Sequence, residues 1–163
     1  QIWAVLSGCA EGERAREIMK KSFSLSGAQV SFAYAYFLFR ALEKTGLYHM
    51  RKPMLDKLRG LSYLGCTTVP ETPENARSEC HAWGASAIYE FLAMDLGVKC
   101  RGGKIIIKPY TDDRSGADGT AYAGSRKVYV KWKKSGGTLY IYTDAKDAEL
   151  DVPENAVINR QCH

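Results

Sequence analysis

Hydrophobic and polar residues follow two different periods along this chain, and the change falls near residue 100. Up to about residue 97, apolar side chains recur every three to four residues, which is the spacing of helices with one buried face. In the stretch "EGERAREIMKKSF", one stripe consists of Ala15, Ile18, Met19 and Phe23, and the charged residues fall opposite. This stretch is therefore expected to form an amphipathic outer helix.

A second helix, between Val30 and Leu42, is expected to be buried more completely. Only Ser31 and Arg40 are strongly polar in it, and its aromatic residues point in all directions around the helix. A helix that is apolar on every side has to be enclosed by other elements. Its tyrosines are therefore assigned to an aromatic core, and Gly46 supplies a usual stop signal.

Two more helices are expected before the period changes. The first lies in "MRKPMLDKLRGLSYLG", where Pro53 either falls in the first turn or kinks the helix. The second stops at Gly97 and has Asp95 on its exposed side, and its apolar stripe consists of Trp83, Ala87, Ile88, Phe91 and Leu92. Amphipathic helices thus alternate with more apolar ones, which indicates stacked helical hairpins with an inner and an outer layer.

From Lys104 onward the period is two, as expected of strands. Four short strands are predicted in "KIIIKP", "KVYVKW", "TLYIYT" and "AELDVP", with a hairpin turn at residues 135–137. In the second of them, Val128, Val130 and Trp132 share one face. The pattern predicts an α+β protein with a helical domain, residues 1–98, and an antiparallel sheet or sandwich, residues 99–163. A single α+β domain with the sheet packed directly on the helices is the alternative.

Composition places the chain among globular proteins. Its 163 residues are 45% apolar and 25% charged, and no apolar run approaches the roughly 20 residues needed to cross a membrane. We therefore expect no membrane partner. The cysteines contain no C-x-x-C pair, so no zinc site is expected, and buried free thiols are the favoured interpretation. They are Cys9, Cys66, Cys80, Cys100 and Cys162.

Positive charge is concentrated in the strand region. Between Lys99 and Lys134 there are ten Lys or Arg residues against three Asp, although the whole chain carries a formal charge of only +5. The lysines alternate with apolar residues in "KVYVKWKK", as on the solvated face of a sheet. A nucleic-acid or anionic-polysaccharide interface is the less favoured interpretation, because Tyr129 is the only aromatic residue assigned to the lysine-bearing face. That interface would use Lys104, Lys108, Lys127, Lys131 and Lys133.

The loop before the last helix has an unusual content. It reads "GCTTVPETPENARSECHAWG" from residue 65 to residue 84 and contains the carboxylate of Glu71, the imidazole of His81 and the indole of Trp83. A connection between two helices needs only turn-forming residues, which this loop also has. The additional groups are a small set suited to site chemistry. A solvated surface carboxylate is the simpler alternative for Glu71.

The loop resembles the C-terminal portion of bacterial α-L-rhamnosidases, which are inverting six-hairpin glycosidases of family 78. In that family a helix ends in Gly-Ala-Thr-Thr-x-Trp-Glu, and the next helix begins with Ser-x-x-His or Ser-x-Cys-His-Ala-Trp. Here the two motifs stand as Gly65-Cys-Thr-Thr-Val-Pro-Glu71 and Ser78-Glu-Cys-His-Ala-Trp83. Downstream, "DLGVKCRGGKIIIKP" and "ADGTAYAGSRKVYVKW" are also similar to family segments.

The resemblance implies the last helices of an (α/α)6 barrel, a partial six-hairpin toroid, followed by a C-terminal antiparallel β-sandwich. It implies that Glu71 is the general base of an inverting hydrolase. It also implies that His81 lies near the bound sugar of a carbohydrate substrate, a rhamnose-containing glycoside. Thr68 and Trp83 are assigned to the same substrate site, although the helical spacing of Trp83 with Ala87 and Ile88 favours a core position for its side chain. No cofactor, metal or nucleic acid is implied.

Two departures from the family pattern lead to further expectations. The general-acid motif does not occur in these residues, so the chain is expected to be a fragment that is inactive alone, with the acid upstream of Gln1. Pro70 stands where the family often has Trp, which favours a non-catalytic carbohydrate-binding or regulatory module as the alternative. An incomplete ring of helices is also expected to expose apolar faces and to favour self-association.

Overall fold

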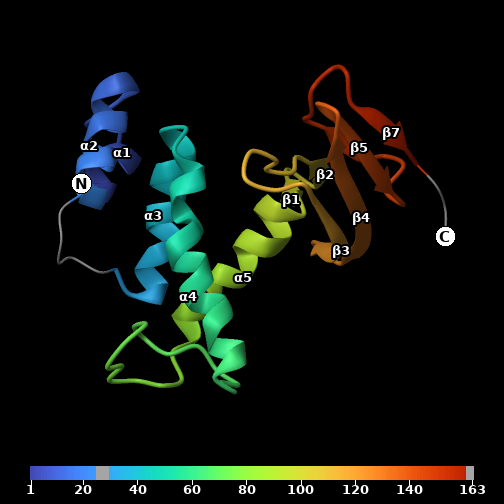
Figure 1. Ribbon diagram of the computed structural model, residues 1–163. Helices are drawn as coiled ribbons and strands as arrows, with labels where there is room; N and C mark the ends of the chain where they lie inside the picture. The colour runs from blue at the N-terminus through green and yellow to red at the C-terminus, as the bar shows by residue number, and fades with distance from the viewer. Residues whose placement is uncertain (25–29, 161–163) are drawn as a thin grey trace. The chain divides into compact units, whose positions relative to one another are not determined.

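The chain divides into a helical unit, Gln1–Ala87, and a second unit, Ile88–His163, which carries the strands of the described residues (Figure 1). The computed structural model describes residues 1–24 and 30–160. The fold is α+β, as the two hydrophobic periods predict. Among the described residues, no helix combines the length and the hydropathy needed to span a bilayer.

The described residues of the helical unit form four α-helices and two short 3-10 helices. Pro53 lies in the first turn of its helix, which is one of the two placements predicted for it. In the predicted amphipathic helix, Ala15 and Met19 of the apolar stripe are buried and the charged residues are mostly exposed. Phe23, the last residue of that stripe, is exposed, so its predicted burial is wrong. The elements are α1 (Ile2–Leu6), α2 (Gly12–Ser24), α3 (Phe32–Lys44), η1 (Tyr48–Arg51), α4 (Lys52–Tyr63) and η2 (Ala82–Ser86).

Helix α3 is buried along one side only. The Ser31 hydroxyl caps it by accepting a hydrogen bond from the backbone N–H of Tyr34 at 3.2 Å. Phe32 and Phe39 are fully buried, but the Tyr34 side chain is 48% exposed, so the expected enclosure on all sides is wrong for this tyrosine. The Phe37 ring instead lies 5.7 Å from the Tyr34 ring, and this aromatic contact covers part of the open side.

The segment before the sheets does not form the single regular helix that was predicted. It passes from η2 through α5 (Ala87–Tyr89) into the π-helix η3 (Glu90–Asp95). A 3-10 helix has about three residues per turn and a π-helix more than an α-helix, so residues four apart do not stay on one face. Trp83, Ile88 and Leu92 of the predicted apolar stripe are therefore exposed.

Asp95, which was expected to be exposed, is buried at the end of η3. Its carboxylate lies 2.7 Å from the Arg114 guanidinium. Its backbone carbonyl accepts a hydrogen bond from Trp132 Nε1 at 2.8 Å. The ion pair offsets the cost of removing this carboxylate from water.

Two mixed sheets form the second unit. Strands β1 (Val98–Arg101), β2 (Lys104–Ile107) and β6 (Glu149–Leu150) make one sheet in the order β1-β2-β6. Strands β3 (Gly116–Ala123), β4 (Arg126–Ser135), β5 (Thr138–Thr143) and β7 (Val157–Asn159) make the other, in the order β3-β4-β5-β7. The expectation of purely antiparallel pairing is wrong at β2·β6 and β5·β7, which are parallel. After β5 the chain crosses to the other sheet for β6 and then returns beside β5, which allows a parallel pair without a helix.

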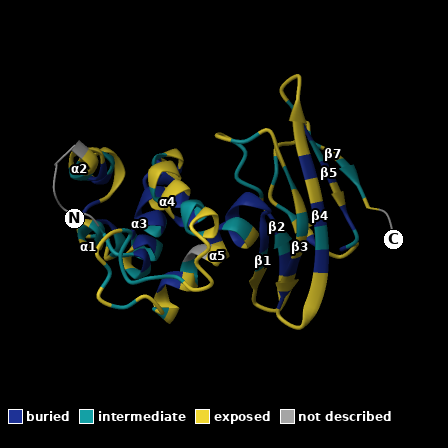
Figure 2. Ribbon diagram, turned by 60° about the horizontal axis from the view of Figure 1, so that its bottom comes forward, coloured by how far each residue is buried: buried dark blue, intermediate teal, exposed yellow. Residues whose placement is uncertain are grey.

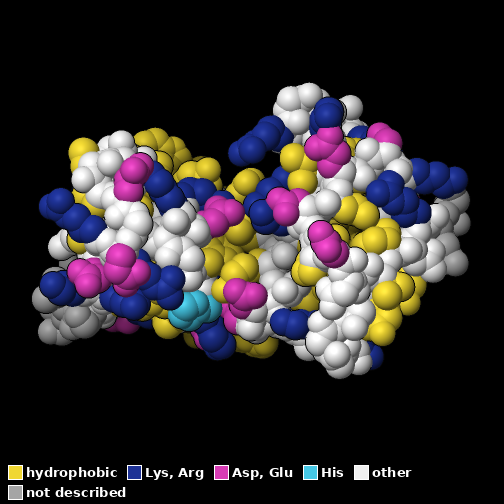
Figure 3. Space-filling view, turned by 90° about the horizontal axis from the view of Figure 1, so that it is seen from above, with side chains coloured by type: hydrophobic (Ala, Val, Ile, Leu, Met, Phe, Trp, Pro, Cys, Tyr) yellow, Lys and Arg dark blue, Asp and Glu magenta, His cyan; other side chains and the backbone are white. Residues whose placement is uncertain are grey.

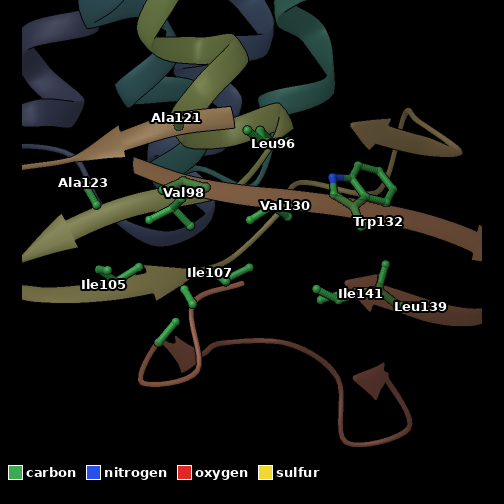
Figure 4. Packing of buried hydrophobic residues seen from close by; sticks show 13 residues of the cluster. Leu96, Val98, Ile105, Ile107, Ala121, Ala123, Val130, Trp132, Leu139 and Ile141 are labelled. Carbon is green, nitrogen blue, oxygen red and sulfur yellow. The ribbon is translucent and has the colours of Figure 1, made fainter. Parts of the chain in front are cut away.

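Both sheets contribute to one hydrophobic core. Val130 and Trp132 from β4 meet Ile105 and Ile107 from β2 in a single cluster (Figure 4). The predicted face of β4 is confirmed, because Val128, Val130 and Trp132 are all buried. Between Val128 and Lys133, buried residues alternate with exposed or half-buried ones along this strand (Figure 2).

The predicted hairpin turn is confirmed. Gly136 and Gly137 both have positive φ, at 58° and 80°, as a tight turn between β4 and β5 requires.

The predicted burial of the cysteine thiols is wrong. The thiols of Cys9, Cys66, Cys80 and Cys100 are free but exposed. They lie in loops or on an outward strand position, where local structure is set by backbone hydrogen bonds and not by apolar packing. Cys162 lies outside the described residues.

Candidate functional site

The loop between α4 and η2 folds back on itself (green in Figure 1). The Glu71 N–H donates to the Ser78 carbonyl at 2.8 Å, and the His81 N–H donates to the Val69 carbonyl, also at 2.8 Å. Residues 69–71 therefore lie beside residues 78–81, although neither stretch forms a β-strand. Loops of this length without secondary structure of their own are usually functional or disordered, and this one is closed by specific bonds.

Side-chain hydroxyls of the loop support the same closure. Thr68 Oγ1 donates to the Glu79 carbonyl at 2.7 Å, and Thr72 Oγ1 donates to the Glu74 carbonyl at 2.9 Å. These two hydroxyl protons are therefore directed at backbone carbonyls of the loop and not at the Glu71 carboxylate. Each hydroxyl oxygen keeps lone pairs that can accept a further hydrogen bond.

The backbone of Glu71 is also tied to helix α3. Its carbonyl accepts a hydrogen bond from the N–H of Phe32 at 3.0 Å. Phe32 is the first residue of α3, and the first N–H groups of a helix have no partner within the helix. Glu71 thus satisfies one of these donors, and the helix in turn fixes the position of Glu71.

The Glu71 carboxylate itself is partly exposed and charge-paired. Its side chain is 23% exposed, and Oε1 lies 3.1 Å from Nη2 of Arg77, whose side chain is 88% exposed. Sequence reasoning did not single out Arg77. The available signal was that it is the only Lys or Arg within residues 65–84. The carboxylate is thus held by a loop cation and not by hydroxyls.

His81 and Trp83 stand together at the start of η2. Their ring centroids are 6.2 Å apart, and the rings are tilted by 70°. His81 is half-buried, whereas the indole of Trp83 is 77% exposed. The interpretation of Trp83 as a core residue is therefore wrong, because Trp83 lies in the short 3-10 helix η2 and its side chain is exposed there.

Close packing holds the loop against the helices at Gly84. A Cβ atom at this buried glycine would lie 2.5 Å from Val69 Cγ1 and 3.3 Å from Phe32 Cβ. Both neighbours belong to the segments that position Glu71. Glycine is therefore required here by space and not by backbone conformation.

Replacing Gly84 by alanine is expected to lower the free energy of unfolding by about 1–3 kcal/mol, because Val69 or the η2 backbone has to move. Urea titration followed by far-ultraviolet circular dichroism measures this change. Gly60→Ala is the matched control, since a Cβ at Gly60 in α4 meets nothing within 4 Å. It is expected to raise stability by about 0.5–1 kcal/mol. Equal effects of the two substitutions would contradict the packing at Gly84.

No protein-family model, curated protein or solved structure matches this chain. The residue types of the loop and their geometry therefore carry the functional argument. Among the described residues, no group of three or more His, Cys, Asp or Glu side chains is placed to hold a metal ion.

Proposed function

We propose that this chain is the C-terminal part of an inverting glycoside hydrolase that resembles α-L-rhamnosidases, and that Glu71 is its general base. The observation that carries the proposal is the closure of the loop. The two segments that resemble the family motifs are hydrogen-bonded to each other between Glu71 and Ser78 and between Val69 and His81. A carboxylate and an imidazole are thereby held on neighbouring backbone segments.

The proposed reaction needs an ionised carboxylate that can reach water. In inverting hydrolysis one carboxylic acid protonates the leaving oxygen, and a second carboxylate, roughly 6.5–9.5 Å away, activates water on the opposite face of the sugar. The ion pair with Arg77 favours the ionised form of the Glu71 carboxylate. Because the Glu71 side chain is 23% exposed, a water molecule can reach it. The general acid is expected outside residues 1–163.

The neighbouring side chains suit a sugar ring. The exposed indole of Trp83 offers an apolar face for the C–H groups of a sugar, and the imidazole of His81 can exchange hydrogen bonds with sugar hydroxyls. The Thr68 oxygen can accept one more hydrogen bond. These three residues are proposed to bind the terminal rhamnose next to Glu71, without a metal or cofactor.

The finer architecture belongs to the same proposal. Helices α1 to α4 are proposed to be the last helices of an (α/α)6 toroid, in which the exposed aromatic side of α3 faces further helices. A second copy of the chain on the same face is the alternative partner. The shared core of the two sheets supports a C-terminal β-sandwich.

A non-catalytic carbohydrate-binding or regulatory module is the second candidate. It is favoured by Pro70 in place of an aromatic residue and by the engagement of the Glu71 carboxylate with Arg77. Such a module would keep the loop geometry and bind the sugar without turnover.

The deciding experiment is the hydrolysis of an aryl α-L-rhamnoside by the full-length protein that contains this segment, followed by proton NMR. An inverting enzyme is expected to release β-L-rhamnose first, which then mutarotates. Release of the α-anomer first would contradict the inverting mechanism. Binding of rhamnose in calorimetry without any hydrolysis would replace the proposal by the second candidate.

A further inference from the structure

Tyrosines and lysines lie opposite one another on the outer face of the four-stranded sheet. In the pairing of β4 with β5, Lys131 is opposite Tyr142 and Lys133 is opposite Tyr140. Directly opposite residues have Cβ atoms about 4.5–5.5 Å apart, so each of these lysines has a tyrosine as its direct neighbour on the adjacent strand. The sequence-based assignment of Tyr129 as the only aromatic residue on the lysine face is therefore wrong, because β5 adds two more.

These side chains line a continuous groove of about 630 Å³. Its walls also include Tyr129 and Ser135, so every lining residue carries a hydroxyl or an ammonium group. The residues between them in sequence, such as Trp132 and Ile141, point into the core on the other side of the sheet. The groove thus lies on the outer face of a sheet whose inner face packs in the hydrophobic core, and we call it the tyrosine groove.

The charge of the tyrosine groove is small. Lys131 Nζ lies 3.1 Å from Asp118 Oδ2 on β3, which compensates its charge. Hydrogen bonds from Lys131 and Tyr129 lower the pKa of Asp118, so this carboxylate stays ionised at neutral pH. Within the described residues, Lys133 has no acidic partner. The groove therefore presents one uncompensated ammonium group beside three phenols.

This small net charge of the groove favours a glycan over a nucleic acid as its ligand. A nucleic-acid strand carries one phosphate per nucleotide and needs a groove that is positive along its length. Here the second lysine is already neutralised, and Asp118 would repel phosphates. On the face seen in Figure 3, Lys and Arg side chains are likewise interspersed with Asp and Glu. A glycan with occasional carboxylates fits better, because its C–H faces stack on phenol rings and its hydroxyls bond with Tyr, Ser and Lys.

We propose that the tyrosine groove binds an acidic glycan, with a sugar carboxylate at Lys133 and sugar rings on Tyr140 and Tyr142. This site lies in the strand-bearing unit and uses none of the loop residues around Glu71. It does not depend on the hydrolase proposal, and Glu71→Gln is expected to leave its affinity unchanged.

The test is isothermal titration calorimetry of the 163-residue chain with an oligogalacturonate in which only occasional carboxylates are free and the others are methyl esters. The same oligosaccharide after complete methyl esterification is the comparison. The wild-type chain is expected to bind the partly free acid about tenfold more tightly than the full ester. Tyr140→Ala and Lys133→Ala are each expected to weaken binding of the acid about tenfold or more. Tyr142→Ala, at an exposed side chain, is a second aromatic variant with little risk to folding.

Tyr122→Ala and Lys127→Ala are the matched controls. Both residues face outward from the same sheet, opposite each other on β3 and β4, but do not line the groove. They are expected to bind the acid as the wild type does. Absence of binding, equal affinity for the ester, equal losses in the control variants, or tighter binding of a single-stranded oligonucleotide would each overturn the proposal.

Discussion

Replacing Glu71 by glutamine in the full-length protein is expected to lower kcat for an aryl α-L-rhamnoside about 10²–10⁴-fold, the usual contribution of general acid–base catalysis. The amide has nearly the shape of the carboxylate but cannot take a proton from water. The loop should persist, because its closing bonds involve the backbone N–H and carbonyl of residue 71 and not its side chain. KM is therefore expected to change little.

The control is Glu74→Gln in the same loop. Glu74 is exposed, and its nearest cation is Lys57, with Nζ at 3.7 Å from Oε1. Surface substitutions of this kind usually change free energies by no more than about 0.5 kcal/mol, so kcat should stay near the wild-type value. Azide added to Glu71→Ala should restore product as a glycosyl azide, because a small anion can replace the activated water. Wild-type kcat in Glu71→Gln would exclude the base role.

The strand-bearing unit could be predicted largely from local pattern. Alternation alone put Val128, Val130 and Trp132 on the buried face of β4, and the Gly136–Gly137 pair marked the turn to β5. These features depend on residues close in sequence. The parallel positions of β6 and β7 depend on crossings between the two sheets, which a period of two does not encode.

In the last helical segment, the local pattern did not predict which side chains are buried. An apolar stripe at α-helical spacing predicts a buried face only if the helix keeps about 3.6 residues per turn. Here the 3-10 start and the π-helical end change that step, so Trp83 is exposed while Asp95 is buried. No residue in the stripe signals this change.

The residue types of the candidate site could be predicted from the sequence, but their geometry could not. Carboxylate, imidazole and indole could be singled out in the sequence, whereas the pairing of residues 69–71 with 78–81 depends on bonds in an irregular loop. The Glu71–Arg77 contact depends on the same closure. The tyrosine groove required the register of β4 against β5, since its phenols come from two strands.

Trp132→Ala is expected to lower the free energy of unfolding of the strand-bearing unit by about 3–5 kcal/mol. The side chain is 1% exposed, sits in the cluster shared by both sheets, and donates its indole N–H to the Asp95 carbonyl at 2.8 Å. Alanine would leave a large cavity and an unpaired buried carbonyl. Total stabilities are about 5–15 kcal/mol, so this loss is a large fraction of the whole.

Trp83→Ala makes the same chemical change at an indole that is 77% exposed, and its urea midpoint should stay close to that of the wild type. Trp132→Phe keeps most of the buried volume but lacks the N–H donor, so its midpoint should fall between those of the wild type and Trp132→Ala. A Trp132→Ala midpoint equal to that of Trp83→Ala would contradict the shared core. Because the tyrosine groove is built on the outer side of β4, a loss of order around Trp132 should also weaken binding of the acidic glycan in this groove. Trp83→Ala should leave that binding unchanged, because Trp83 belongs to the proposed rhamnose site and does not line the groove.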